Sequence, residues 1–232
     1  MAITYEGVGT QDAVSGGTDT LSPDVPGSLA NNDILIIVTA DGTSDSVYTW
    51  PNGYTEGGQG NVSGGSFGWG WKRSDGTDTG TEDLVKDNSD WNQWMALIFV
   101  MRGVRTAGNP FDTKDATYGA GASGNTHEIT TSEANCQMLA VLSVEDNTGG
   151  DVDDNYSLHF EVFDATGNDT GIHVWYQDVA VASTVGAEGV TFGAYERHGI
   201  WTFDLVPAGA AAAAITVPAA HYYDRIRKVS GD

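Results

Sequence analysis

The sequence predicts an all-β protein, an antiparallel β-sandwich of jelly-roll type. Its apolar residues fall in short runs with strand character, separated by Gly, Asp, Asn, Ser and Thr. Glycine accounts for 31 of the 232 residues, about twice its usual share. We find no sustained i, i+3, i+4, i+7 apolar spacing of the kind that predicts a helix. We therefore expect roughly ten to twelve short strands, the pattern of a sandwich or barrel.

Four core strands are predicted between residues 33 and 144. Residues 33–40 form a continuous β-branched apolar run, long enough for a strand buried on both faces. Residues 66–72 alternate aromatic side chains with glycine, which places the large rings on one face. Residues 94–104 are expected to form the central strand of the core, and residues 137–144 a further apolar strand.

Two hairpins are predicted in the last third of the chain. Residues 158–162 and 172–176 flank a segment of turn chemistry. His159 and His173 then fall on facing strands, on the solvated side opposite the core residues. Residues 190–195 and 200–206 are expected to form the second hairpin, with residues 196–199 as its loop.

The chain divides into a single sandwich domain, residues 1–207, and an Ala-rich extension with a basic C-terminal tail, residues 208–232. Three of the ten basic residues lie in this last part. It is either a disordered tail with incidental charge or an arm that docks on a neighbouring subunit. Together with the N-terminal strand, residues 3–8, it supplies our candidate contacts with other subunits: Ile3, Tyr5, Tyr222, Tyr223, Arg225, Arg227 and Lys228.

The charge balance limits the possible partners. Ten basic residues against 32 acidic residues give a net charge of −22. Nucleic-acid binding needs clustered Lys and Arg, so we expect no nucleic-acid partner. The same balance argues against an anionic membrane surface. The first residues do not resemble a signal peptide, so we expect synthesis and assembly in a cytoplasm.

Two segments match sequence patterns of known active sites, but neither is followed by the secondary structure that such a site requires. Residues 64–68 match G-x-S-x-G, but they lead into an aromatic strand and not into the helix that a nucleophile elbow requires. Residues 119–124 match G-x-G-x-x-G, but a strand-like run follows, so we interpret them as a flexible loop. No histidine spacing indicates a zinc site. We therefore expect neither an enzyme nor a bound cofactor.

One acidic loop of the sequence could bind calcium. Residues 146–154 concentrate four carboxylates, and calcium takes six to eight oxygen ligands. The spacing differs from that of an EF-hand, and a solvated turn is the simpler interpretation. The candidate ligands are Asp146, Asp151, Asp153 and Asp154.

The seven tryptophans and nine tyrosines are many for this length. Aromatic rings either fill the space between the sheets of a sandwich or, where exposed, stack on sugars. We expect Trp69, Trp71 and Trp94 to lie in the core, because they fall inside predicted strands. The candidates for a glycan-binding platform lie near predicted loops: Trp50, Tyr54 and Trp91.

The order of several motifs resembles a β-sandwich module that recurs in structural proteins of tailed phages. The motifs are NDILIIV at residues 32–38, PNGYT at 51–55, FGWGWK at 67–72, WMALIFVMRGV at 94–104 and NPFD at 109–112. The Thr-rich edge and apolar strand of residues 125–144 also fit that module, so that the resemblance covers a little over half the chain. Tyr54 stands where the module usually has Trp.

The resemblance implies a virion component at the particle surface. Our leading hypothesis is a capsid decoration protein that binds the major capsid protein or another virion protein and stabilises the phage head. The protein class implies a homo-oligomer, with a trimer favoured. The first alternative is a spike or tail-fibre module that binds a receptor or glycan. The second is a carbohydrate-acting enzyme, for which no acid/base pair can be assigned among the 32 carboxylates.

Overall fold

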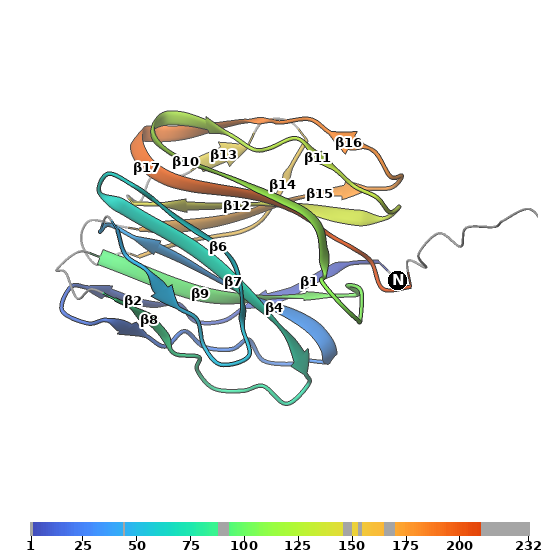
Figure 1. Ribbon diagram of the computed structural model, residues 1–232, viewed down its shortest axis with the longest axis horizontal. Helices are drawn as coiled ribbons and strands as arrows, with labels where there is room; N and C mark the ends of the chain where they lie inside the picture. Colours follow the sequence, from blue (N-terminus) through green and yellow to red (C-terminus); the bar gives the residue numbers. More distant parts are fainter. Residues whose placement is uncertain are drawn as a thin grey trace, which may run out of the picture.

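The computed structural model describes residues 2–43, 45–87, 93–145, 150–152, 155–164 and 170–209. The all-β prediction is confirmed, because these residues form seventeen strands and no helix (Figure 1). Six of the strands have only two or three residues, which leaves eleven longer ones. No helix able to span a membrane occurs in this part of the chain.

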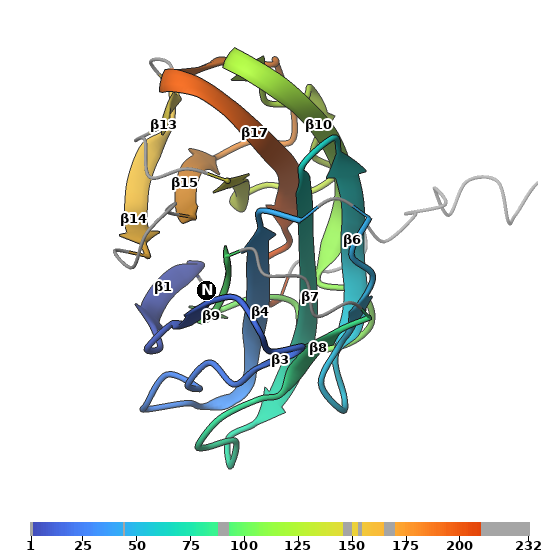
Figure 2. The ribbon, with the colours of Figure 1, turned by 90° about the vertical axis from the view of Figure 1, so that its left-hand side faces the viewer.

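Two six-stranded antiparallel sheets pack face to face (Figure 2). The first has the order β1-β9-β4-β7-β6, with β2 also paired to β9. The second has the order β10-β17-β12-β15-β14, with β13 also paired to β17. The strands of the first sheet are β1 (Thr4–Val8), β2 (Asp12–Ser15), β4 (Asn31–Asp41), β6 (Thr55–Val62), β7 (Gly65–Asp75) and β9 (Gln93–Arg102). Those of the second are β10 (Phe111–Asn125), β12 (Cys136–Val144), β13 (Gly150–Val152), β14 (Ser157–Phe163), β15 (Gly171–Val179) and β17 (Gly189–Leu205).

Each main sheet is built from one half of the sequence. Only the connection from β9 to β10 passes between them. The sandwich is therefore confirmed, but its strands do not pass back and forth between two sheets as those of a jelly roll do. Two small sheets complete the fold: β3 (Thr20–Leu21), β8 (Leu84–Lys86) and β5 (Tyr48–Thr49) form one, and β11 (Ile129–Thr130) and β16 (Thr184–Val185) form the other.

Strands β4 and β9 are buried on both faces, as their continuous apolar sequences predict. Ile36, Val38 and Leu97 belong to the cluster between the two sheets. Leu35 and Ile98, which point to the opposite face, belong to a second cluster with residues of β5 and β8. The small β3-β8-β5 sheet therefore covers the outer face of the first sheet, and β9 has the central role predicted for it.

The alternation of aromatic residues and glycine in β7 serves both faces of the strand. Phe67 and Trp69 enter the cluster between the sheets, as predicted. On the other face, a Cβ at Gly68 would lie 2.9 Å from Tyr48 Cδ2, and one at Gly70 would lie 2.9 Å from Trp50 Cε3. These distances are too short for a side chain, so the glycines provide the space in which Tyr48 and Trp50 lie.

The second predicted hairpin is wrong. Residues 189–205 form one continuous strand, β17, which pairs with β10 on one side and with β12 on the other. Gly199, predicted to lie in a turn, is needed for packing instead, because a Cβ there would lie 2.8 Å from Phe67 Cβ. Residues 119–124, predicted as a flexible loop, are likewise part of strand β10.

A buried ion pair joins the first sheet to its cover. Lys86 Nζ lies 3.2 Å from Asp41 Oδ2, and both side chains are fully buried. Asp41 also accepts hydrogen bonds from Thr43 N (2.9 Å) and Ser46 Oγ (2.8 Å). The Lys86 ammonium lies 4.9 Å from the centre of the Trp94 ring. Burial raises the pKa of Asp41, against the opposing effect of Lys86.

We predict that Lys86→Met destabilises the protein by roughly 3–5 kcal/mol, because it leaves the Asp41 carboxylate buried without a cation. The double variant Asp41→Asn/Lys86→Met should recover most of that loss, since it removes both charges. Urea unfolding of the three proteins measures both effects. Equal stability of the single and double variants would contradict this account.

Candidate functional site

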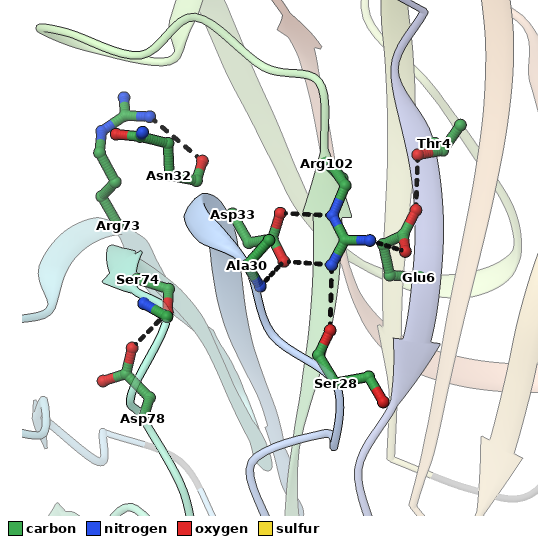
Figure 3. A network of polar contacts seen from close by, with 11 residues as sticks. Thr4, Glu6, Ser28, Ala30, Asn32, Asp33, Arg73, Ser74, Asp78 and Arg102 are labelled. Atoms are coloured by element: carbon green, nitrogen blue, oxygen red, sulfur yellow. Dashed lines mark hydrogen bonds and ion pairs between the residues drawn. The ribbon is translucent and has the colours of Figure 1, made fainter.

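Arg102, the arginine of the R-G-V motif, holds together three segments of the first sheet (Figure 3). Its Nε and Nη2 donate to the two carboxylate oxygens of Asp33 at 2.9 and 2.7 Å. Nη2 also donates to Ser28 O at 3.0 Å, and Nη1 lies 2.6 Å from Glu6 Oε2. Asp33 is 1% exposed. The hydrogen bonds to Asp33 are the main cause of the raised pKa of Arg102.

The next two residues of the motif bring the beginning and the end of the described chain together. Gly103 has φ +79°, and a Cβ there would lie 2.2 Å from Ala2 O. Its carbonyl accepts a hydrogen bond from Ala208 N at 2.6 Å. Val104 forms an isolated β-bridge with Pro207. The R-G-V motif thus positions both the first described residues and residues 207–208, close to the last described residue.

Two adjoining hollows lie at this end of the sandwich. Both are lined by Ala2 and Asn135. The larger, about 410 Å³, is also lined by Glu133, Ala134, Pro207, Ala208 and Gly209. The smaller, about 230 Å³, is also lined by Ile3, Cys136, Asp178, Val179 and Ala180. Each hollow has one carboxylate and no basic residue in its lining, and we call the pair the terminal hollows.

Of the predicted subunit contacts, the structure places Ile3 in the lining of the smaller terminal hollow. The ring of Tyr5, another predicted contact, stacks on His159 with 4.9 Å between centroids. His159 in turn stacks on Tyr176 at 3.9 Å. This three-ring stack joins the edge of the first sheet to the second. Tyr222, Tyr223, Arg225, Arg227 and Lys228 lie outside the described residues.

The first predicted hairpin is confirmed as β14 and β15, but its histidines do not lie together on a solvated face. A register shift between Leu158 and Phe160 separates them. His159 lies in the ring stack, 3.4 Å from Gln137 Oε1. His173 is fully buried, and within the described residues neither of its ring nitrogens forms a hydrogen bond, although Nδ1 lies 3.6 Å from Glu161 Oε2. Burial lowers the pKa of both histidines to about 4.

The structure places the two described members of the predicted glycan platform against the body of the protein. Trp50 lies over the glycines of β7, and its Nε1 donates to Glu56 Oε2 at 3.4 Å. The Tyr54 hydroxyl is buried without a hydrogen-bond partner, and Lys72 Nζ lies 5.1 Å from the centre of the Tyr54 ring. Trp91 lies outside the described residues.

The calcium prediction stays a prediction. Asp151 is exposed in β13, whereas Asp146, Asp153 and Asp154 lie outside the described residues. Within the described part of the chain, no three His, Cys, Asp or Glu side chains are grouped so that they could hold a metal ion. Cys136 is buried, and burial is the main cause that raises its pKa to about 11.

Sequence reasoning missed the pairing of Arg102 with Asp33. One signal was present: Asp33 opens an apolar run, and Arg102 ends another. Charged residues at the ends of strands that are otherwise buried often require a partner. We also compared the chain with known proteins. No protein-family model, curated protein or solved structure matches it.

We predict that Arg102→Ala costs about 2–4 kcal/mol of stability, because it removes the cation from the buried Asp33 carboxylate. Arg102→Lys should restore only part of this loss, since lysine lacks the planar fork that contacts both oxygens. Arg105→Ala is the control. Arg105 makes a half-exposed pair with Asp112 at 3.2 Å, and its loss should cost at most about 1 kcal/mol. Equal effects at positions 102 and 105, measured by urea unfolding, would refute the proposed role.

His159, which is half-buried, and His173, which is fully buried, predict destabilisation by mild acid. Because the pKa of each is lowered to about 4 in the fold, the unfolded chain binds their protons first as the pH falls below about 6.5. Stability should therefore be retained above that pH and decline as the pH falls towards 4. His159→Phe keeps a ring in the stack and removes its proton, so it should reduce the decline in unfolding free energy between about pH 7 and pH 5. An unchanged decline would contradict the assignment to His159.

Proposed function

We propose that the protein is a non-enzymatic structural component of a virus particle, and that it decorates the head of a tailed phage. The observation that carries the proposal is that the first and last described residues, Ala2 and Gly209, line the same terminal hollow. Ile3, a candidate subunit contact, lines the adjoining hollow. The remaining C-terminal candidate contacts follow Gly209 in the sequence and lie outside the described residues.

The charge distribution supports an intermolecular role for the C-terminal segment. Residues 210–232 contain three of the ten basic residues and only two of the 32 acidic ones. The remaining chain therefore has seven basic residues against thirty acidic ones. A positively charged segment is attracted to acidic surfaces, including that of a neighbouring copy.

The length of this segment is sufficient to reach another subunit. Its 23 residues span up to roughly 75–80 Å when extended. A decoration protein stabilises a shell by adding buried area at a repeated junction. In the proposed arrangement, the sandwich is the rigid body and the basic segment is the arm that contacts an adjacent virion protein. The acidic body then faces outward, where like charge keeps neighbouring particles apart.

We predict that wild-type protein is present on purified particles in hundreds of copies, counted by mass spectrometry against the major shell protein. Deleting residues 219–232 should remove it from the particles while leaving its unfolding free energy unchanged. The full-length variant Arg225→Gln/Arg227→Gln/Lys228→Gln separates the effect of charge from that of length. This variant should reduce the copy number to the extent that binding depends on the three positive charges.

Each outcome has a definite meaning for the proposal. Absence of the wild-type protein from particles would overturn it. A handful of copies would exclude head decoration and favour a spike or fibre. Undiminished binding of the truncated protein would show that the arm is not the contact.

A further inference from the structure

Two strand edges lie side by side along one side of the sandwich (Figure 2). They belong to β6, the last strand of the first sheet, and β10, the first strand of the second. Within the described residues, β10 pairs only with β17 and β6 only with β7. The outer N–H and C=O groups of such edge strands are available to pair with another strand.

Strands β6 and β10 are held together as one preformed surface. Lys114 Nζ on β10 donates a hydrogen bond to Gly57 O on β6. The ring of Tyr118 lies so close to Gly60 that a Cβ there would be 2.4 Å from it. Trp201 Nε1 donates to the Tyr118 hydroxyl at 3.1 Å, which fixes that ring from the other side. An incoming strand would therefore meet an ordered edge.

Part of this side of the sandwich, next to the charged residues Glu56 on β6 and Lys114 and Asp115 on β10, lacks the charges that usually protect strand edges from pairing. Residues 116–125 of β10 read ATYGAGASGN, and residues 57–62 of β6 read GGQGNV, with no charged residue in either. The opposite side carries Glu6 on β1 and Glu161 on β14. In a protein with a net charge of −22, ten consecutive uncharged residues on a fifteen-residue edge strand are a specific feature.

Charge also indicates which partner fits. Two copies of a strongly acidic protein repel one another over most of their surfaces, and a neutral edge is where they approach at the lowest electrostatic cost. The small side chains at Ala120, Ala122 and Ser123 are exposed. They leave the backbone accessible and fit opposite the same small residues of another copy. Antiparallel pairing about a two-fold axis brings the same segment of each molecule together, as an isologous contact requires.

We infer that the uncharged edge of β10, residues 116–125, pairs with the same edge of a second copy of this chain. The second sheets of the two molecules would then join along the regular part of this edge, residues 116–121, which precedes the register shift of β10 between Gly121 and Ser123. The β6 edges, pinned to β10, would extend the contact area. This homotypic contact does not depend on the proposed virion function.

The test is the oligomeric state of the full-length protein, measured by analytical ultracentrifugation over a range of concentrations. The wild type should form a dimer. Ala120→Glu/Ala122→Glu places like charges opposite one another and should weaken dimerisation about tenfold or more. The matched control is Ser157→Glu/Leu158→Glu, which adds the same charge at two exposed positions of the β14 edge. The control should dimerise like the wild type.

A second measurement keeps the test independent of the variants. Amide hydrogen exchange in residues 116–125 should slow as the wild-type concentration rises, while exchange in β14 should not change. A wild type that stays monomeric would overturn the inference. The inference would also be overturned if both double variants weakened the oligomer equally, or if neither variant weakened it. If amide exchange in residues 116–125 slowed only when another protein was added, the edge would pair with a strand of that protein and not with a second copy of this chain.

Discussion

The burial of β4 on both faces is the constraint on which the rest of the structure depends. An eleven-residue strand with two apolar faces needs a cover on each side. The second sheet covers one face, and the small β3-β8-β5 sheet covers the other. Near each end of β4 a buried carboxylate requires a cation, and the chain supplies Arg102 for Asp33 and Lys86 for Asp41. The two ion pairs fix β4 to β1 and β9 near one end and to β8 at the other.

The strands were predictable from the sequence where the apolar run is long, and much less so where glycine interrupts it. Residues 33–40 and 94–104 contain continuous apolar runs of a length that favours a strand buried on both faces. Gly199 has the appearance of a turn residue, yet it lies in mid-strand because Phe67, 132 positions earlier in the chain, occupies the space of its side chain. A glycine needed for a turn and one needed for close packing are identical in sequence.

The candidate site was predictable only in part, for a related reason. The N-terminal strand and the C-terminal segment stand out as candidate contacts from their composition alone. The approach of Ala2 and Ala208 to Gly103 depends instead on the folded structure, as does the bidentate contact between Asp33 and Arg102, which are 69 positions apart in the chain. The burial of His173 likewise depends on its packing within the folded sheet, which local alternation does not specify.

The two proposed contacts involve different residues of β10 and β17. Phe111 pairs with Leu205, next to the residues that line the larger terminal hollow. Residues 116–121 pair with residues 196–201, further along both strands. We therefore expect both contacts to form on one molecule. A molecule with an arm at one end and a pairing edge towards the other can bind a surface and a second copy of itself simultaneously, and the two affinities then reinforce each other through effective concentration.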